Sequence, residues 1–141
     1  MNFLFDTSVI SAQRRADRLP SHVSDWLAGV AATDVYISAI TLQEIETGVL
    51  RMERTDPAQG ARLRRWKDDM VSGALSGRIL PVDETVAECC AALHVPDPRP
   101  ALDALIGATA IVHRMTLVTR NVADFEAMPV KIFNPWTLAG Q

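Results

Sequence analysis

The sequence contains few of the residues that build disulfide-bonded or zinc-binding proteins. Its 141 residues include only two cysteines and three histidines, and no CxxC or Cys/His zinc pattern. Cys89 and Cys90 are neighbours, and adjacent cysteines bond to each other only with strained geometry. We therefore expect no structural disulfide and two small apolar side chains packed in a helix. The three histidines, His22, His94 and His113, are expected to pack or to lie at the surface.

Long hydrophobic runs and an excess of positive charge are also missing. No apolar stretch reaches the roughly 18 residues that cross a bilayer, and the N-terminus lacks the basic start and cleavage site of a signal peptide. We therefore expect a cytoplasmic protein that makes no membrane contact. The formal net charge of −3 argues against an indiscriminate nucleic-acid binder. Aromatic residues, on which single-stranded nucleic acids stack, make up only 6% of the chain.

The sequence does contain an alternation of short β-type runs and longer helical patterns. Its composition, 48% hydrophobic and 22% charged, and its length fit one globular domain, expected to span residues 1–141. The patterns predict strands at residues 2–5, 35–38, 79–82, 115–119 and 130–133. They predict helices at residues 20–30, 41–52, 57–71, 83–94 and 101–114, with a proline-rich loop at 95–100. This alternation favours an α/β fold, a three-layer α/β/α sandwich with a mainly parallel sheet.

Four acidic residues occupy positions that have both a structural and a functional explanation. Asp6 ends the first strand, where it could simply cap a helix. Glu44 completes a capping box with Thr41, in which both side chains bond backbone N–H groups at the helix start. Asp103 suits the dipole of an otherwise apolar helix, and Asp124 suits a turn. Segments that follow parallel strands meet at one edge of the sheet, where ligands bind, so we also expect Asp6, Glu44 and Asp124 to converge. Small residues on the helix at 101–114 should let it approach the sheet closely and bring Asp103 near them.

A cluster of carboxylates needs protons or a cation to neutralise it. Two carboxylates about 4 Å apart repel by roughly 4 kcal/mol at an effective dielectric of about 20. Oxygen ligands of this kind suit Mg²⁺ or Mn²⁺ rather than zinc. Such an ion can orient a phosphate and lower the pKa of a bound water. The four carboxylates therefore suggest hydrolysis of a phosphodiester by a metal-activated water.

The same residues lie in four stretches that resemble motifs of the PIN-domain family. These stretches are LFDTSVIS at residues 4–11, VYISAITLQE at 35–44, DALIGATA at 103–110 and LVTRNVADF at 117–125. The segments GRILPVD at 77–83 and FNPW at 133–136 further resemble the VapC/FitB-like branch of the family. The resemblance spans nearly the whole chain in the expected order. Two residues depart from the usual pattern, Ser8 in place of Asn and Gly107 in place of Ala, and the loop before Asp103 is shorter than usual.

This resemblance implies a Mg²⁺- or Mn²⁺-dependent endoribonuclease that is the toxin of a type II toxin–antitoxin pair and leaves a 5′-phosphate. It implies four acidic ligands of the metal or of its waters: Asp6, Glu44, Asp103 and Asp124. Residues expected to hydrogen-bond around them are Thr7, Ser8, Thr119 and Asn121. Among these, Thr119 is expected to bond the Asp6 region or a ligand water, and Asn121 to brace the turn of Asp124.

The implied partners are an RNA substrate, a small antitoxin that covers the active site, and a second copy of the chain. The resemblance favours a homodimer, and a dimer of heterodimers with the antitoxin. Candidates for holding RNA phosphates are Arg14, Arg15, Arg18 and Arg120. A solvated face explains the first three equally well. The arginines and the lysine at residues 51–67 could face solvent, antitoxin or RNA, and Trp26, Trp66 and Trp136 fit core or dimer packing.

Two alternatives remain open at this point. One is a catalytically silent PIN-like module that only binds a partner. The other is a phosphatase or receiver-like domain with Asp6 as nucleophile or phosphoacceptor. The second fits poorly, because Ser8 stands where a phosphatase of that kind needs a second acid.

Overall fold

The computed structural model describes residues 1–140, with side chains up to Thr137, and its centre is a five-stranded sheet. The strands are β1 (Phe3–Phe5), β2 (Val35–Ser38), β3 (Ile79–Leu80), β4 (Thr116–Val118) and β5 (Ile132–Phe133). They lie in the order β3-β2-β1-β4-β5, and each pair of neighbours is parallel. The predicted mainly parallel sheet is therefore confirmed. β3 stops before Pro81, which has no N–H group to donate to a neighbouring strand.

Side chains alternate between the two faces of the sheet, as the two-residue period of a strand requires. Leu4 of β1 and Leu117 of β4 pack on one face, while the next residues, Phe5 and Val118, pack on the other. All four are at most 1% exposed. Both faces of the sheet are thus covered, which is the usual state of a parallel sheet and explains why its strands are continuous apolar runs.

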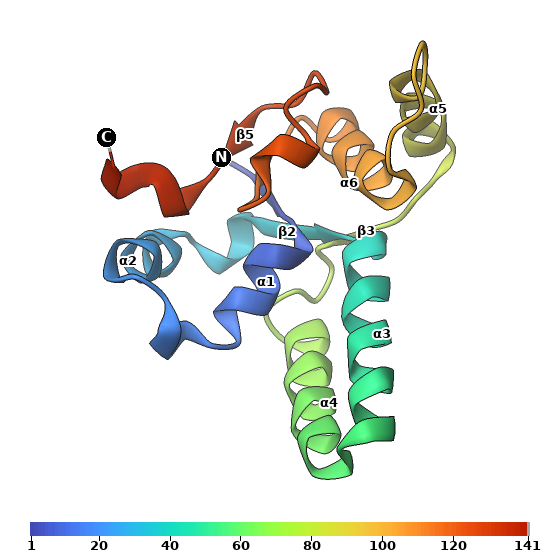
Figure 1. The fold of residues 1–141 in the computed structure, drawn as a ribbon. Helices are drawn as coiled ribbons and strands as arrows, with labels where there is room; N and C mark the ends of the chain where they lie inside the picture. Colours follow the sequence, from blue (N-terminus) through green and yellow to red (C-terminus); the bar gives the residue numbers. More distant parts are fainter. Residues whose placement is uncertain (141) are drawn as a thin grey trace.

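Helices form a layer on each face of the sheet (Figure 1). They are α1 (Thr7–Gln13), α2 (Ser21–Gly29), α3 (Ala39–Thr55), α4 (Pro57–Ser72), α5 (Glu84–Leu93) and α6 (Ala101–Val112). Helices α5 and α6 pack on the face of Leu4, whereas α1, α2 and α4 pack on the face of Phe5. This arrangement confirms the predicted three-layer sandwich. Within the described residues, no helix is both long enough and apolar enough to span a membrane.

Short 3-10 segments complete the chain. They are η1 (Ala16–Arg18), η2 (Ala32–Asp34), η3 (Val122–Asp124) and η4 (Pro135–Gly140). Figure 1 shows the C-terminal segment η4 beside α2, an element more than a hundred residues earlier in the sequence. The segment at 121–125, predicted as a turn, forms η3, and its backbone closes through the Asp124 N–H group, which donates to the Asn121 carbonyl at 3.1 Å.

The start of α3 differs by two residues from the predicted helix at 41–52. The prediction of a capping box formed by Thr41 and Glu44 is wrong, because α3 begins at Ala39, directly after β2. Ser38 is the N-cap, and its hydroxyl oxygen accepts a hydrogen bond from the Ile40 N–H group at 3.0 Å. Serine caps a helix as well as threonine does, so the earlier residue takes the role. Thr41 and Glu44 therefore lie inside the helix, with side chains free for other partners.

The cysteines and histidines have the structural roles predicted for them. Cys89 and Cys90 are not bonded to each other, and both lie in α5. Burial raises the pKa of the Cys90 thiol, which keeps it protonated and unreactive. His94 accepts a hydrogen bond from the Arg99 backbone N–H group at 3.0 Å, which ties the loop before α6 to the end of α5.

Helices α3 and α4 form a hairpin that projects from the sheet (Figure 1). Arg64 of α4 donates to Glu46 at 2.8 Å and to Glu53 at 3.0 Å, and Lys67 lies 3.1 Å from Glu46. These pairs explain part of the basic stretch at 51–67. Its members Arg64 and Lys67 join the two helices, so they are not an open basic surface.

Gly60 allows the two helices of the hairpin to approach closely. A Cβ atom on Gly60 would lie 2.5 Å from the Glu53 Cα atom, which belongs to the backbone of the other helix. We expect Gly60→Ala to lower the free energy of unfolding by about 1–3 kcal/mol, because the helices must separate. Gly48 in α3 is the matched control, since a Cβ there meets nothing within 4 Å. Gly48→Ala should raise stability by about 0.5–1 kcal/mol. Urea unfolding followed by circular dichroism measures both, and equal effects of the two substitutions would contradict this account of the hairpin.

Candidate active site

The site lies at the carboxyl edge of the sheet, where β1, β2 and β4 end. β1 is paired with β2 on one side and with β4 on the other. The chain therefore leaves β1 toward one neighbour and returns at β4 on the other side, and the segments beyond the strands open a crevice between them. Asp6 follows β1 and Thr119 follows β4, whereas β2 continues into α3 with Glu44. The topology alone thus brings together residues that are more than a hundred positions apart.

Asp6 is buried, with 5% of its surface exposed, and its carboxylate has three donors. It is the N-cap of α1, and its Oδ1 atom accepts from the Ser8 N–H group at 3.2 Å. Its Oδ2 atom accepts from the Ser8 hydroxyl at 3.1 Å and from the Thr119 hydroxyl. The bond between Thr119 and Asp6 that the family resemblance implied is therefore present. The Thr119 hydroxyl oxygen in turn accepts from the Asn121 N–H group at 2.9 Å, which links this network to the segment of Asp124.

Glu44 is half-buried on α3 and faces α1. Its Oε1 atom accepts a hydrogen bond from the Thr7 hydroxyl at 2.6 Å. The same hydroxyl lies 3.3 Å from that of Thr41, which is fully buried. Thr7 and Ser8 are adjacent in α1, so the first turn of this helix contacts both Asp6 and Glu44. A single short helix therefore orients two of the four acids.

Asp103 lies in the first turn of α6, and small residues bring this helix close to the rest of the fold. Ala104, Gly107 and Ala108 are all buried. A Cβ atom on Gly107 would lie 2.5 Å from the sulfur of Met128, which follows the segment of Asp124. Glycine at this position therefore makes room for Met128.

The four acids share one electrostatic environment. The pKa of Asp103 is raised above its ordinary value, first by burial and then by the negative charges of Asp124, Asp6 and Glu44. The structure thus brings all four predicted carboxylates into one neighbourhood. Across residues 1–140, however, no three His, Cys, Asp or Glu side chains lie close enough together to enclose a metal ion. The acids form a common negative field rather than a tight cage of ligands.

Among the hollows on the α1 side of the fold, two bear on where the site lies. One, of about 170 Å³, opens beside Glu44 and is lined by Thr7, Arg14 and Trp66 among others. It brings Arg14, one of the predicted RNA-binding residues, next to the acidic site. Arg15 and Arg18 are exposed around η1 and make no ion pair within the described residues.

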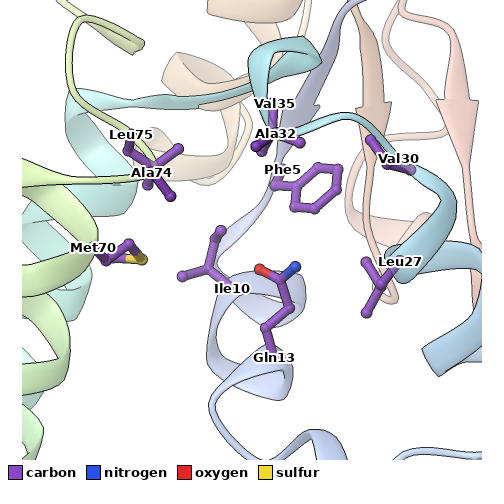
Figure 2. Close-up of a pocket in the computed structure, with 10 residues that line it drawn as sticks. All are labelled: Phe5, Ile10, Gln13, Leu27, Val30, Ala32, Val35, Met70, Ala74 and Leu75. Atoms are coloured by element: carbon purple, nitrogen blue, oxygen red, sulfur yellow. The ribbon is translucent and has the colours of Figure 1, made fainter.

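The other hollow, of about 250 Å³, lies between α1, α2 and α4 (Figure 2). Its walls are apolar side chains such as Phe5, Ile10 and Met70, and the Gln13 amide extends into it. It contains no acidic or basic group, so it offers nothing for proton transfer or metal binding. The candidate chemistry therefore lies at the carboxylates and not in this cavity.

Two contributions to the site escaped the sequence analysis. Thr41 was assigned to a helix cap, but its hydroxyl lies in the network that holds Glu44. Trp136 was assigned to core or dimer packing, but its ring also contacts the guanidinium of Arg120, 5.1 Å from the ring centre. The segment Asn134-Pro135-Trp136 was visible as a motif, although nothing in its sequence indicates which residue it contacts.

The fold and the site define a class of protein, a parallel α/β domain with acidic residues gathered at the carboxyl edge of its sheet. The sequence profile described as PIN domain matches residues 3–131. The chain belongs to the PIN-domain family. This membership excludes the phosphatase and receiver alternatives, because those proteins belong to other families.

Full-length relatives agree with this assignment. The chain is 35% identical to "Toxin FitB" of Neisseria gonorrhoeae over 138 residues, which cover 94% of this chain and 97% of FitB. It is 32% identical to "VapC ribonuclease Y4jK" of Sinorhizobium fredii, over 94% of this chain and 96% of that protein. Its structure resembles a chain in the crystal structure of FitAcB from Neisseria gonorrhoeae with a TM-score of 0.82 and 34% identity. That alignment covers 96% of this chain and 99% of the other.

The raised pKa of Asp103 predicts that the stability of the folded protein depends on pH. Because the folded state binds this proton more tightly than the unfolded chain, stability falls as pH rises from about 3.9, the ordinary value for Asp, through the folded pKa. We expect Asp103→Asn to melt at a higher temperature than the wild type at neutral pH in EDTA, with the difference shrinking as the pH approaches about 4. Asp97→Asn, on the exposed loop before α6, is the control and should not change the pH dependence. A melting temperature of Asp103→Asn at or below that of the wild type at every pH would disprove the repulsion.

Proposed function

We propose that the chain is a metal-dependent endoribonuclease and the toxin of a type II toxin–antitoxin pair. The observation that carries the proposal is the position of Asp103, whose pKa responds to Asp6, Glu44 and Asp124 together. Membership of the PIN-domain family and similarity to a protein named VapC ribonuclease support RNA as the substrate. Similarity to a protein named Toxin FitB supports the biological role.

The acidic residues fit a divalent cation in their chemistry. All four offer carboxylate oxygens, the ligands that Mg²⁺ and Mn²⁺ favour. Because three of them do not lie together at ligand spacing, we propose that some of the contacts run through water molecules, several of which Mg²⁺ usually retains. Asp6, Asp103 and Asp124 are the proposed ligands of the ion or of its waters, and Glu44 completes the negative set. A bound ion would supply charge neutralisation and a water of lowered pKa.

The other residues of the site orient the acids. The hydroxyls of Ser8 and Thr119 direct the Asp6 carboxylate, and the hydroxyl of Thr7 directs Glu44. Asn121 holds Thr119 through its backbone and closes the turn that presents Asp124. The pKa of Asp103 is raised by burial and by the charges of the other three acids, so a cation bound among them would lower it again. The proposed reaction is attack of a water on a phosphodiester: a new P–O bond forms as the bond from phosphorus to the 3′ oxygen breaks, which leaves a 5′-phosphate on one product and a 3′-hydroxyl on the other.

Cleavage of RNA tests the proposal directly. Purified wild type should cut single-stranded RNA only with Mg²⁺ or Mn²⁺, and Asp6→Asn and Asp103→Asn should each reduce the rate at least about a hundredfold. Asp25→Asn, an exposed acid on α2, is the control and should cut normally. End-labelled fragments analysed on gels report both the rate and the 5′-phosphate. Equal cleavage by the wild type and both site variants would mean contamination, and the enzyme hypothesis would fail.

The silent-module alternative predicts a different outcome of the same experiment. A module that only binds a partner would cut no RNA with any divalent ion, although it folds normally. The presence of all four carboxylates favours the enzyme, since a silent module gains nothing from acids that repel one another.

The partner is the second part of the proposal. The family resemblance supports a small antitoxin that covers the acidic site, a homodimer, and a dimer of heterodimers with the antitoxin. We expect the product of a short neighbouring gene to copurify with this chain and to inhibit its RNA cleavage at equal molar ratio. Copurification without inhibition would show that the partner binds away from the site. The cytoplasmic location and the single domain at 1–141 remain predictions.

A further inference from the structure

Arg120 lies at the rim of the acidic site, directly after Thr119. Its backbone N–H group donates to the Ser8 hydroxyl oxygen at 3.3 Å, and both Ser8 and Thr119 bond Asp6. The side chain is exposed. Although four carboxylates gather nearby, Arg120 forms no ion pair with any acid among the described residues. Its guanidinium instead lies over the ring of Trp136, 5.1 Å from the ring centre.

Trp136 is held in place by contacts of its own. The Asn134 Oδ1 atom accepts from the backbone N–H group of Trp136 at 2.9 Å, and the Asn134 amide nitrogen lies 3.5 Å from the Arg120 carbonyl oxygen. The His22 ring on α2 is 3.1 Å from the Trp136 carbonyl oxygen. The ring itself is half-buried against the core on the Phe5 face. These contacts hold the indole ring of Trp136 in place. Asn134 bonds the backbones of both Trp136 and Arg120, so it also links the ring to the arginine that rests on it.

Contact with an aromatic ring keeps an arginine available for binding even when it lies next to a cluster of acids. An unrestrained arginine next to carboxylates would form an ion pair with one of them. Neither the guanidinium nor that carboxylate would then be free to bind another partner. A guanidinium that rests on an aromatic ring keeps its N–H groups free for another anion. RNA is a polyanion that must approach a negatively charged site, so a positive charge at the rim lowers the cost of that approach.

We propose that Arg120 binds a backbone phosphate of the substrate RNA and that Trp136 is the positioning residue that holds Arg120 for this contact. The proposal rests on the proposed ribonuclease function. Trp136 acts through Arg120 and not on the RNA itself, because the guanidinium covers its ring. Removing the ring should therefore matter only while Arg120 is present.

Binding of RNA without cleavage provides the test. In an Asp103→Asn background, the affinity for a fluorescein-labelled single-stranded RNA is measured by anisotropy between about 50 and 200 mM salt. Arg120→Gln should weaken binding about tenfold and reduce the slope of log affinity against log salt by about 0.7, the loss of one phosphate contact. Trp136→Leu should weaken binding about threefold, and Trp136→Phe, which keeps an aromatic face, should restore most of it. The variant with both Arg120→Gln and Trp136→Leu should bind like Arg120→Gln alone.

Arg114→Gln is the matched control, because Arg114 is exposed and precedes the same strand that Arg120 follows. It makes the same change of charge at the opposite edge of the sheet and should leave affinity nearly unchanged. In the cleavage-competent chain, Arg120→Gln should raise KM and preserve kcat. Thermal melts check folding, and Trp136→Met replaces Trp136→Leu if the latter is unfolded.

Three results would overturn the proposal. Arg120→Gln could bind like Arg114→Gln, Trp136→Leu could weaken binding equally with and without Arg120, or Trp136→Phe could be as weak as Trp136→Leu. Each could occur in a chain that still cuts RNA with metal, so each would refute this inference alone. A chain that neither binds nor cuts RNA would refute the proposed function and this inference with it.

Discussion

The buried carboxylate of Asp6 is the group on which the arrangement of the site depends. A charge with 5% exposure is costly unless hydrogen bonds satisfy it. Its donors come from the first turn of α1 and from the end of β4, so the charge is satisfied only when β1 and β4 are correctly paired. The same bonds fix the position of Thr119, from which the chain continues to Asp124. Satisfying this one buried charge thus links the start of α1 to the segment that follows β4.

The fold was largely predictable from the sequence because its signals are local. Apolar strand runs separated by helical periods indicate a parallel sheet, and Asp83 caps α5 as its position suggests, accepting from the Val86 N–H group at 2.9 Å. Errors arose where two local signals compete. Ser38 and Thr41 both suit a helix N-cap, and only the end of β2 decides between them. The convergence of the four acids was predictable in outline from topology and family resemblance, because parallel strands end at one edge. Their spacing was not, since it depends on packing such as the contact between Gly107 and Met128.

The structural and functional explanations of the acids are not exclusive. Asp6 is an N-cap and also part of the negative cluster. Glu44, once released from the supposed capping box, bonds Thr7 and contributes to the charge around Asp103. Evidence for a cap therefore does not count against a role in chemistry. A stronger indication is the raised pKa of Asp103, because a purely structural carboxylate gains nothing from three like charges nearby.

The basic residues divide into two groups by what satisfies them. Arg64 and Lys67 in the middle of the chain pair with Glu46 and Glu53 and hold the α3–α4 hairpin together. Arg14 and Arg120 make no ion pair among the described residues, and they flank the acidic site in different ways. Arg14 lines the hollow beside Glu44, whereas the guanidinium of Arg120 rests on the ring of Trp136. The number of basic residues in a stretch of sequence does not by itself mark an open basic surface, since Arg64 and Lys67 of the densest stretch are paired with acids. In a chain of net charge −3, cations that are not paired with acids near the carboxylates supply local positive charge that would favour the approach of a polyanion.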